Sequence, residues 1–100
     1  MNEKAEKNPW VWVMVQGAAG NEQYVGQHDA ESDVLFIPAF PTKDDGLKGF
    51  HLVNRDKSQK VEVQAVRLKE LAEDAAANGF MIFVIDGEGS IKEKLDPRDL

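Results

Sequence analysis

The sequence predicts one α+β (or α/β) domain, in which a mixed sheet of five to six strands carries two helices on one face. Three observations predict it: a length of 100 residues that suits a single core, several apolar runs of strand length, and one clear helical stripe. The expected element order is β-β-β-α-β-α-β-β. We expect the domain to cover residues 10–93, between a flexible leader at 1–9 and a polar tail at 94–100.

The first predicted strand is Trp10–Gln16, where apolar residues occupy both alternating faces, as in a buried central strand. The small and polar residues of Gly17–Asn21 favour a hairpin loop, and Glu22–Gly26 follows as an antiparallel return strand. We expect Trp10 and Trp12 to cover the core, and the alternative is an exposed aromatic binding platform.

The next two segments differ in polarity. Gln27–Asp33 has three acidic residues at alternate positions and is predicted to be a solvated connection. Val34–Ile37 is a short apolar strand that ends near Pro38.

The first predicted helix, Lys43–Phe50, follows Thr42, whose hydroxyl can accept a hydrogen bond from the backbone N–H of Asp45. Gly46 and Gly49 each cost a helix roughly 1 kcal/mol relative to alanine. We therefore expect this helix to be short and to be held mainly by burying Leu47 and Phe50.

A turn is predicted over Asn54–Gln59, and Val61–Val66 alternates like a strand with one solvated face. The residues expected to face inward are Val61, Val63 and Ala65, and those expected to face solvent are Glu62 and Gln64.

The clearest predicted helix is Arg67–Asn78, because apolar residues recur at i, i+3, i+4 and i+7, and Gly79 can end it in the left-handed conformation. Phe80–Ile85 has no polar alternation and is predicted to be a strand buried on both faces. Asp86–Gly89 has the composition of a hairpin turn, after which a return strand begins. The segment Val61–Ile85 is the best candidate for a parallel strand-helix-strand unit with a right-handed connection.

The composition excludes several classes of function. With 12 Lys and Arg against 18 Asp and Glu, the net charge is −6, which repels nucleic acid and anionic lipid, so we expect neither as a partner. The chain has no cysteine, which rules out disulfides, thiolate metal sites and cysteine nucleophiles. No segment has the apolar run of a signal peptide or the roughly 20 apolar residues of a membrane span, so we expect a cytoplasmic protein.

One pattern over residues 34–91 resembles that of a known family. It consists of a strand with proline and phenylalanine, a threonine that opens a helix, a valine-rich strand, a leucine-rich helix and a final apolar strand. The corresponding positions are residues 36–40, Thr42, 61–66, 68–76 and 80–85. With this pattern, Val34–Ile91 resembles the SseB-like domain, a small α/β family of poorly characterised function. The resemblance implies the fold and a regulatory or interaction role, and it carries over no catalytic residue.

Four residues are candidates for a binding site: Thr42, Arg67, Lys69 and Asp86. Arg67 and Lys69 occupy the first turn of the second helix, where no local side chain caps the backbone N–H groups, so the site would attract an anion. The alternative is that both cations pair with nearby acids or face water. Thr42 and Asp86 fall near strand ends, where we expect any pocket that also involves Arg67.

No metal site, cofactor or catalytic residue is predicted. His28 and His51 are the only histidines, and their spacing matches no ligand motif. The series that starts at Asp86 mimics a calcium loop, but Ile91 stands where that loop needs glycine. The Gly17–Gly20 loop lacks the glycine signatures of phosphate-binding loops.

We therefore expect a small non-enzymatic protein-interaction or regulatory module, which binds itself as a homodimer or binds another protein through a sheet edge or the concave sheet face opposite the helices. The alternative is a sensor for a small ligand (an anion or a nucleotide) or a weak enzyme, with a pocket near Thr42, Arg67 and Asp86. In self-association, the acidic N-terminal half would meet a basic strip whose members are Arg55, Lys57, Lys60, Arg67 and Lys69.

Overall fold

The computed structural model describes residues 8–17, 20, 22–51 and 60–100. Within these residues the elements, in chain order, are β1 (Trp10–Gln16), β2 (Gln23–Tyr24), β3 (Gln27–Asp29), β4 (Val34–Ala39), α2 (Lys43–Gly49), β5 (Val61–Arg67), α3 (Leu68–Asn78), β6 (Met81–Ile85), β7 (Ile91–Leu95) and the 3-10 helix η1 (Pro97–Asp99). One strand was missed, because Gln27–Asp33, predicted to be a connection, contains β3. Its residues lack apolar alternation, and pairing with β4 defines the strand instead.

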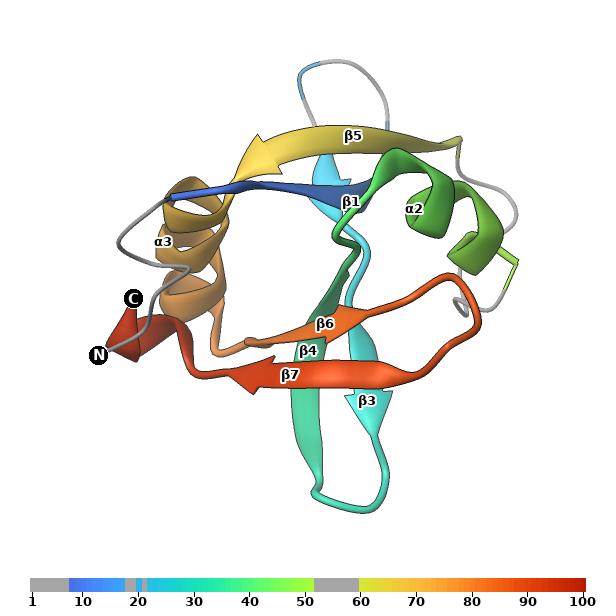
Figure 1. Cartoon of the computed structure of the whole chain (residues 1–100). Helices are drawn as coiled ribbons and strands as arrows, with labels where there is room; N and C mark the ends of the chain where they lie inside the picture. The colour runs from blue at the N-terminus through green and yellow to red at the C-terminus, as the bar shows by residue number, and fades with distance from the viewer. Residues whose placement is uncertain (1–7, 18–19, 21, 52–59) are drawn as a thin grey trace.

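The strands form two sheets rather than the single sheet of five to six strands that the sequence predicts. The smaller sheet is antiparallel and has the order β2-β1-β5, and the larger has the order β3-β4-β6-β7. In Figure 1, β1 and β5 lie above β6 and β7, and β4 runs between the two levels. The single-sheet prediction was wrong because periodicity identifies strands but does not say which distant strands pair.

Backbone hydrogen bonds join the two sheets where β1 passes the end of β4. Trp12 N–H donates to the Phe40 carbonyl at 2.8 Å, and Phe40 N–H donates to the Trp12 carbonyl at 2.7 Å. Two residues further along β1, the Met14 carbonyl accepts a hydrogen bond from Val25 N–H at 2.9 Å. The N-terminal strand therefore contributes hydrogen bonds to both halves of the fold.

The parallel pair in the fold is β4 with β6, in the register Ile37 opposite Ile82. The predicted parallel unit over Val61–Ile85 was wrong, because β5 pairs with β1 in one sheet while β6 lies in the other. The chain between β4 and β6 instead includes α2, β5 and α3. As predicted, β6 is buried on both faces, with Phe83 and Val84 at most 2% exposed.

The main core lies between α3 and the adjoining faces of β1, β4 and β6. The predicted apolar stripe of α3 is buried there; its members are Leu68, Leu71, Ala72 and Ala75. The helix begins at Leu68, one residue later than predicted, and ends at Asn78, after which Gly79 caps it with a left-handed φ of 78°. From β1 this core receives Val11, Val13 and Val15.

A smaller cluster lies on the opposite face of β1, under α2. It contains Met14 and Phe40, with Trp12 and Val63 packed against it. A Cβ at Gly46 of α2 would lie 3.0 Å from Val63 Cγ1 and 3.5 Å from Trp12 Cβ, so the helix backbone sits close to the sheet. The two helices therefore cover opposite faces of the β2-β1-β5 sheet, and the prediction that they share one face was wrong.

The alternation predicted for β5 is present, but its faces are covered differently. Val61 and Val63 pack against the cluster under α2, whereas Ala65 is exposed and Val66 packs against the main core. The inward orientation predicted for Ala65 was wrong, because α2 has only seven residues and leaves that end of the face open. The turn predicted at Asn54–Gln59 lies outside the described residues.

The C-terminal segment, predicted to be a polar tail over 94–100, contains the end of β7 and the η1 helix. Pro97 is buried and Leu100 packs against the main core. At the other end, residues 1–7 of the predicted leader lie outside the described residues. No helix in the described part of the chain is long and apolar enough to cross a bilayer.

Candidate functional site

A tryptophan with an arginine stacked on it lies at the open end of the small sheet. The antiparallel register places Trp10 opposite Arg67 and Trp12 opposite Ala65, all on the face that α2 covers only in part. The guanidinium carbon of Arg67 lies 4.2 Å from the centroid of the Trp10 ring, within range of a cation–π contact. Trp10 is nevertheless 54% exposed, so the prediction that it covers the core was wrong.

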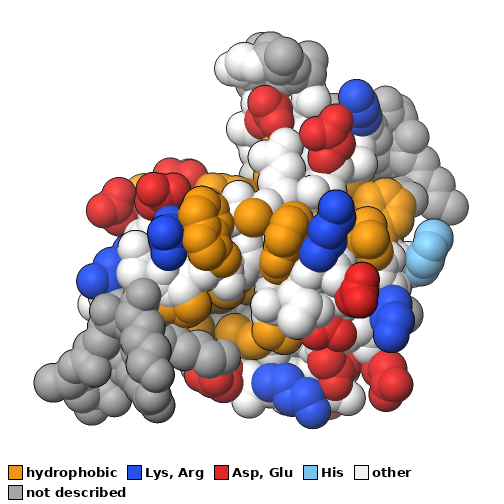
Figure 2. Space-filling view, turned by 45° about the horizontal axis from the view of Figure 1, so that its top comes forward, with side chains coloured by type: hydrophobic (Ala, Val, Ile, Leu, Met, Phe, Trp, Pro, Cys, Tyr) orange, Lys and Arg blue, Asp and Glu red, His pale blue; other side chains and the backbone are white. Residues whose placement is uncertain are grey.

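A second cation and aromatic pair extends this surface toward α2. Lys43, the first residue of α2, places its Nζ 5.9 Å from the centroid of the Trp12 ring. Leu47, one helical turn further along, is 50% exposed, so the prediction that it is buried was wrong. We call this surface the Trp strip; it consists of Trp10, Trp12, Lys43, Leu47, Ala65 and Arg67. Figure 2 shows hydrophobic side chains alternating with Lys and Arg across this side of the molecule.

The start of α3 has a cap that comes from outside the helix. No local side chain caps it, as expected, but Asn8 Oδ1 accepts a hydrogen bond from Lys69 N–H at 2.9 Å. The Pro9 carbonyl accepts from Leu68 N–H at 2.9 Å, and Arg67 Nη1 donates to the Asn8 carbonyl at 3.1 Å. The backbone N–H groups of Leu68 and Lys69, which we expected to attract an anion, therefore donate hydrogen bonds to the protein itself. The partners are 61 residues apart, so no local pattern could reveal this cap.

The side chains of Thr42 and Asp86 accept hydrogen bonds from backbone N–H groups close to them in sequence. Thr42 Oγ1 accepts a hydrogen bond from Asp45 N–H at 3.1 Å, which is the predicted cap of α2. Asp86 Oδ1 accepts from Glu88 N–H and Ser90 N–H at 2.9 Å each, and the bond from Ser90 is the largest cause of the lowered pKa of this carboxyl. The predicted β6–β7 hairpin turn is thus built around the Asp86 side chain.

The structure brings two of the four predicted binding residues onto neighbouring segments. Asp45 Oδ1 accepts a hydrogen bond from Gly87 N–H at 3.1 Å, which ties the start of α2 to the hairpin turn that contains Asp86. Arg67 lies instead at the end of β5 beside Trp10, and Lys69 is exposed on α3. None of Thr42, Arg67, Lys69 and Asp86 is among the described residues that line a groove of about 550 Å³ between α3 and the β2-β1-β5 sheet.

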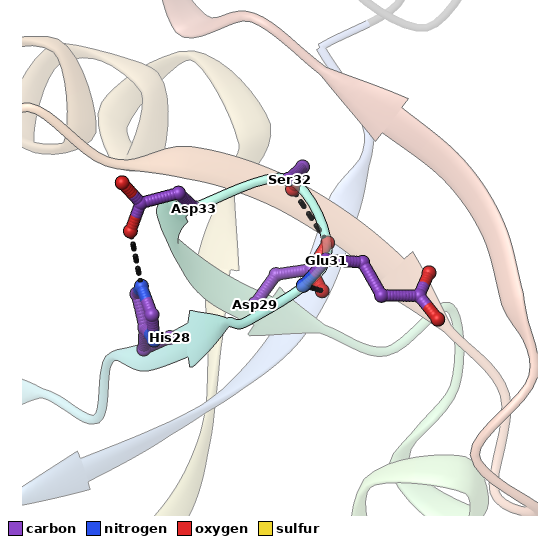
Figure 3. A network of polar contacts seen from close by, with 5 residues as sticks. All are labelled: His28, Asp29, Glu31, Ser32 and Asp33. Atoms are coloured by element: carbon purple, nitrogen blue, oxygen red, sulfur yellow. Dashed lines mark hydrogen bonds and ion pairs between the residues drawn. The ribbon is translucent and has the colours of Figure 1, made fainter.

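The acidic turn between β3 and β4 is held by its own polar groups (Figure 3). His28 Nε2 and Asp33 Oδ1 lie 2.8 Å apart, and Ser32 Oγ donates to Asp29 Oδ2 at 2.6 Å. The bond from Ser32 is the largest cause of the lowered pKa of Asp29. These contacts satisfy the turn, and the described residues contain no group of three His, Asp or Glu side chains arranged to hold a metal ion.

Several predicted features lie wholly or partly outside the described residues. They include positions 18, 19 and 21 of the loop after β1, and Arg55 and Lys57 of the predicted basic strip. Comparison of the chain with protein-family models, curated proteins and solved structures found no match. The resemblance to the SseB-like domain therefore stays a prediction.

Proposed function

We propose that this protein is a non-enzymatic interaction module, and that the Trp strip binds an extended acidic segment of another protein. The observation that supports this proposal is the exposure of Trp10, a large aromatic side chain that is half exposed while the Arg67 guanidinium stacks on its ring. Exposed tryptophan and arginine are the residues most often responsible for binding energy at protein interfaces. The stacked arginine limits the freedom of the indole before binding, which lowers the entropy that a partner must overcome.

The charge of the strip favours an acidic partner. Arg67 and Lys43 each flank an indole ring, and no member of the strip is Asp or Glu. A guanidinium that stacks on an aromatic ring keeps N–H groups at its edge for a carboxylate. A partner that alternates carboxylates with apolar side chains would therefore meet both components of this surface.

The position of β5 favours an extended partner. β5 is the last strand in the order β2-β1-β5, and no other strand in the described part of the chain pairs with its outer edge. An open edge presents backbone N–H and C=O groups to which a further strand can add. A segment that adds along β5 would run beside Ala65 and Arg67 of the strip.

Isothermal titration with two synthetic peptides tests this function. One peptide alternates Glu with Val, and the second has Lys in place of each Glu. We expect only the acidic peptide to bind, and we expect Trp10→Ala to weaken its binding at least about tenfold, as at an interface hot spot. Arg67→Glu should exchange the preference, so that the basic peptide binds instead.

Lys92→Glu is the matched control, since it makes the same charge change on β7 of the other sheet. It should leave binding of the acidic peptide unchanged, and far-UV circular dichroism should show that every variant is folded. Equal binding of both peptides to the wild-type protein, or affinities that Trp10→Ala and Arg67→Glu leave unchanged, would contradict the proposal. Light scattering without peptide tests the alternative occupant, a second copy of the chain, because a dimer that Arg67→Glu dissolves would assign the strip to self-association.

A further inference from the structure

A groove of about 550 Å³ opens between α3 and the β2-β1-β5 sheet, on the face of the sheet opposite α2. Its apolar lining includes Val15, Ile37 and Phe80, of which Val15 and Ile37 are buried. Its polar lining includes Glu22 from the segment before β2, Gln64 from β5 and Asp74 from α3. Its volume falls in the range of small-molecule sites. It shares no residue with the Trp strip.

The charge around this groove is negative. Gln64 Nε2 lies 3.3 Å from Glu22 Oε2 and 3.3 Å from Glu62 Oε2, so one neutral amide is shared between two carboxylates. No Lys or Arg is among the described residues that line the groove. Tyr24, which also lines it, has a pKa raised by partial burial and by the negative charges of Asp74 and Glu70. Two carboxylates, those of Glu22 and Asp74, thus line the same groove.

The apolar and acidic residues of the lining together favour an organic cation over a metal ion. A metal ion needs several oxygen ligands around one point, and the described residues hold no such group. An alkylammonium ion suits the groove better, because its hydrocarbon chain can cover the half-buried rings of Tyr24 and Phe80 while its charged end stays near water at the rim. Glu22 and Asp74, both exposed, stand at that rim.

We propose that the groove between α3 and the three-stranded sheet binds an aliphatic ammonium group, with Glu22 and Asp74 contacting the charge and Tyr24 and Phe80 contacting the chain. A free alkylamine and the side chain of a lysine in another protein share this chemistry. The carboxylates face solvent, so the affinity is modest, with a dissociation constant on the order of 1 mM.

Two-dimensional ¹H–¹⁵N NMR of the full chain tests the site with three probes: n-pentylammonium, the neutral isostere 1-pentanol, and Nα-acetyl-lysine-N-methylamide. We expect saturable shifts of the Gln64 and Asn78 side-chain amides and of the Tyr24 backbone amide with both ammonium probes. 1-Pentanol should bind about tenfold more weakly, since it lacks the charge. Tighter binding of n-pentylammonium than of the lysine derivative identifies a free amine as the natural ligand, and the reverse order identifies a lysine side chain.

The variants Glu22→Gln and Asp74→Asn remove charge with little change in shape. Together they should weaken n-pentylammonium binding about tenfold. Glu73→Gln is the matched control, because Glu73 precedes Asp74 on α3 but does not line the groove. It should leave the affinity unchanged.

A second measurement uses the wild-type protein alone and so does not depend on how the variants fold. Raising NaCl from about 10 mM to about 500 mM should weaken binding of n-pentylammonium but not of 1-pentanol, because salt screens exposed charges. The proposal is overturned by any of three results: no saturable shift at the groove, equal affinity for n-pentylammonium and 1-pentanol, or full affinity in the Glu22→Gln/Asp74→Asn protein. None of these measurements involves the Trp strip, so failure here is distinct from failure of the proposed function.

Discussion

Replacing Gly49 by alanine has two opposite effects on the free energy of unfolding, and their sizes can be compared. Alanine is the better helix former, and the exchange favours a helix by at most about 1 kcal/mol. In this structure, however, a Cβ at Gly49 would overlap Phe40 Cε1 and lie 2.6 Å from Phe40 Cζ, closer than real Cβ atoms approach. The ring cannot move aside freely, because Phe40 is 1% exposed and packs in the cluster under α2.

The contact with Phe40 should outweigh the helix preference. Overpacking of this kind costs about 1–3 kcal/mol, occasionally more, and Gly49 is the last helical residue, where the gain from alanine is smallest. We therefore expect Gly49→Ala to lower the free energy of unfolding by about 1–2 kcal/mol. Equilibrium urea denaturation, followed by far-UV circular dichroism, measures this difference.

A double-mutant cycle identifies the cause. Phe40→Leu removes the two ring atoms that the new Cβ would meet, so Gly49→Ala should be neutral or stabilising in that background. Gly46→Ala is the control within the same helix, because its nearest contact, with Val63 Cγ1, is 3.0 Å and its penalty should be smaller. A Gly49→Ala protein at least as stable as the wild type, or the same penalty with and without Phe40→Leu, would refute the reasoning.

Three further predictions concern stability. Asn8→Ala should lower the free energy of unfolding by about 1 kcal/mol, because Asn8 Oδ1 caps Lys69 N–H at the start of α3; unchanged urea denaturation would show that the cap contributes nothing. Leu71→Ala should cost about 2–5 kcal/mol, since Leu71 is fully buried under α3, and a loss below about 1 kcal/mol would contradict the packing described. The hydrogen bonds from Arg98 lower the pKa of Asp96 to about 2, so its contribution to stability is complete above the unfolded pKa near 4 and is lost as pH falls toward 2; NMR titration of Asp96 should give this low pKa, and Arg98→Ala should raise it.

The elements with strong local signals were predicted correctly. β1 and the buried strand β6 follow from their apolar runs, and α3 follows from its apolar stripe and from Gly79. The Thr42 cap of α2 was also predicted, since the bond to Asp45 N–H depends on residues three apart. In each case the interactions that define the element lie within one short segment.

The features that sequence reasoning missed depend on distant segments. The alternation of residues along β5 shows which side chains share a face. It does not show which face another element covers, and Ala65 was misassigned for that reason. Trp10 is large and aromatic, as many core residues are, yet it lies beyond the end of α2 and stays half exposed. The groove beside Asp74 could not be predicted either, because its lining comes from segments on both sides of α3 and from the helix itself.

The pairing of the first strand with the fifth also constrains how the chain reaches this structure. β1 is complete at Gln16, but its hydrogen-bonding partner β5 begins only at Val61, and β4 finds its parallel partner only at Met81. Proteins whose contacts join distant segments fold more slowly than those with local contacts, because loop closure must precede the gain in contact energy. During synthesis, the N-terminal half therefore emerges from the ribosome with the Trp10–Gln16 strand unpaired on its β5 side. The small sheet can be completed only after β5 ends at Arg67, and the larger sheet only after β7 ends at Leu95.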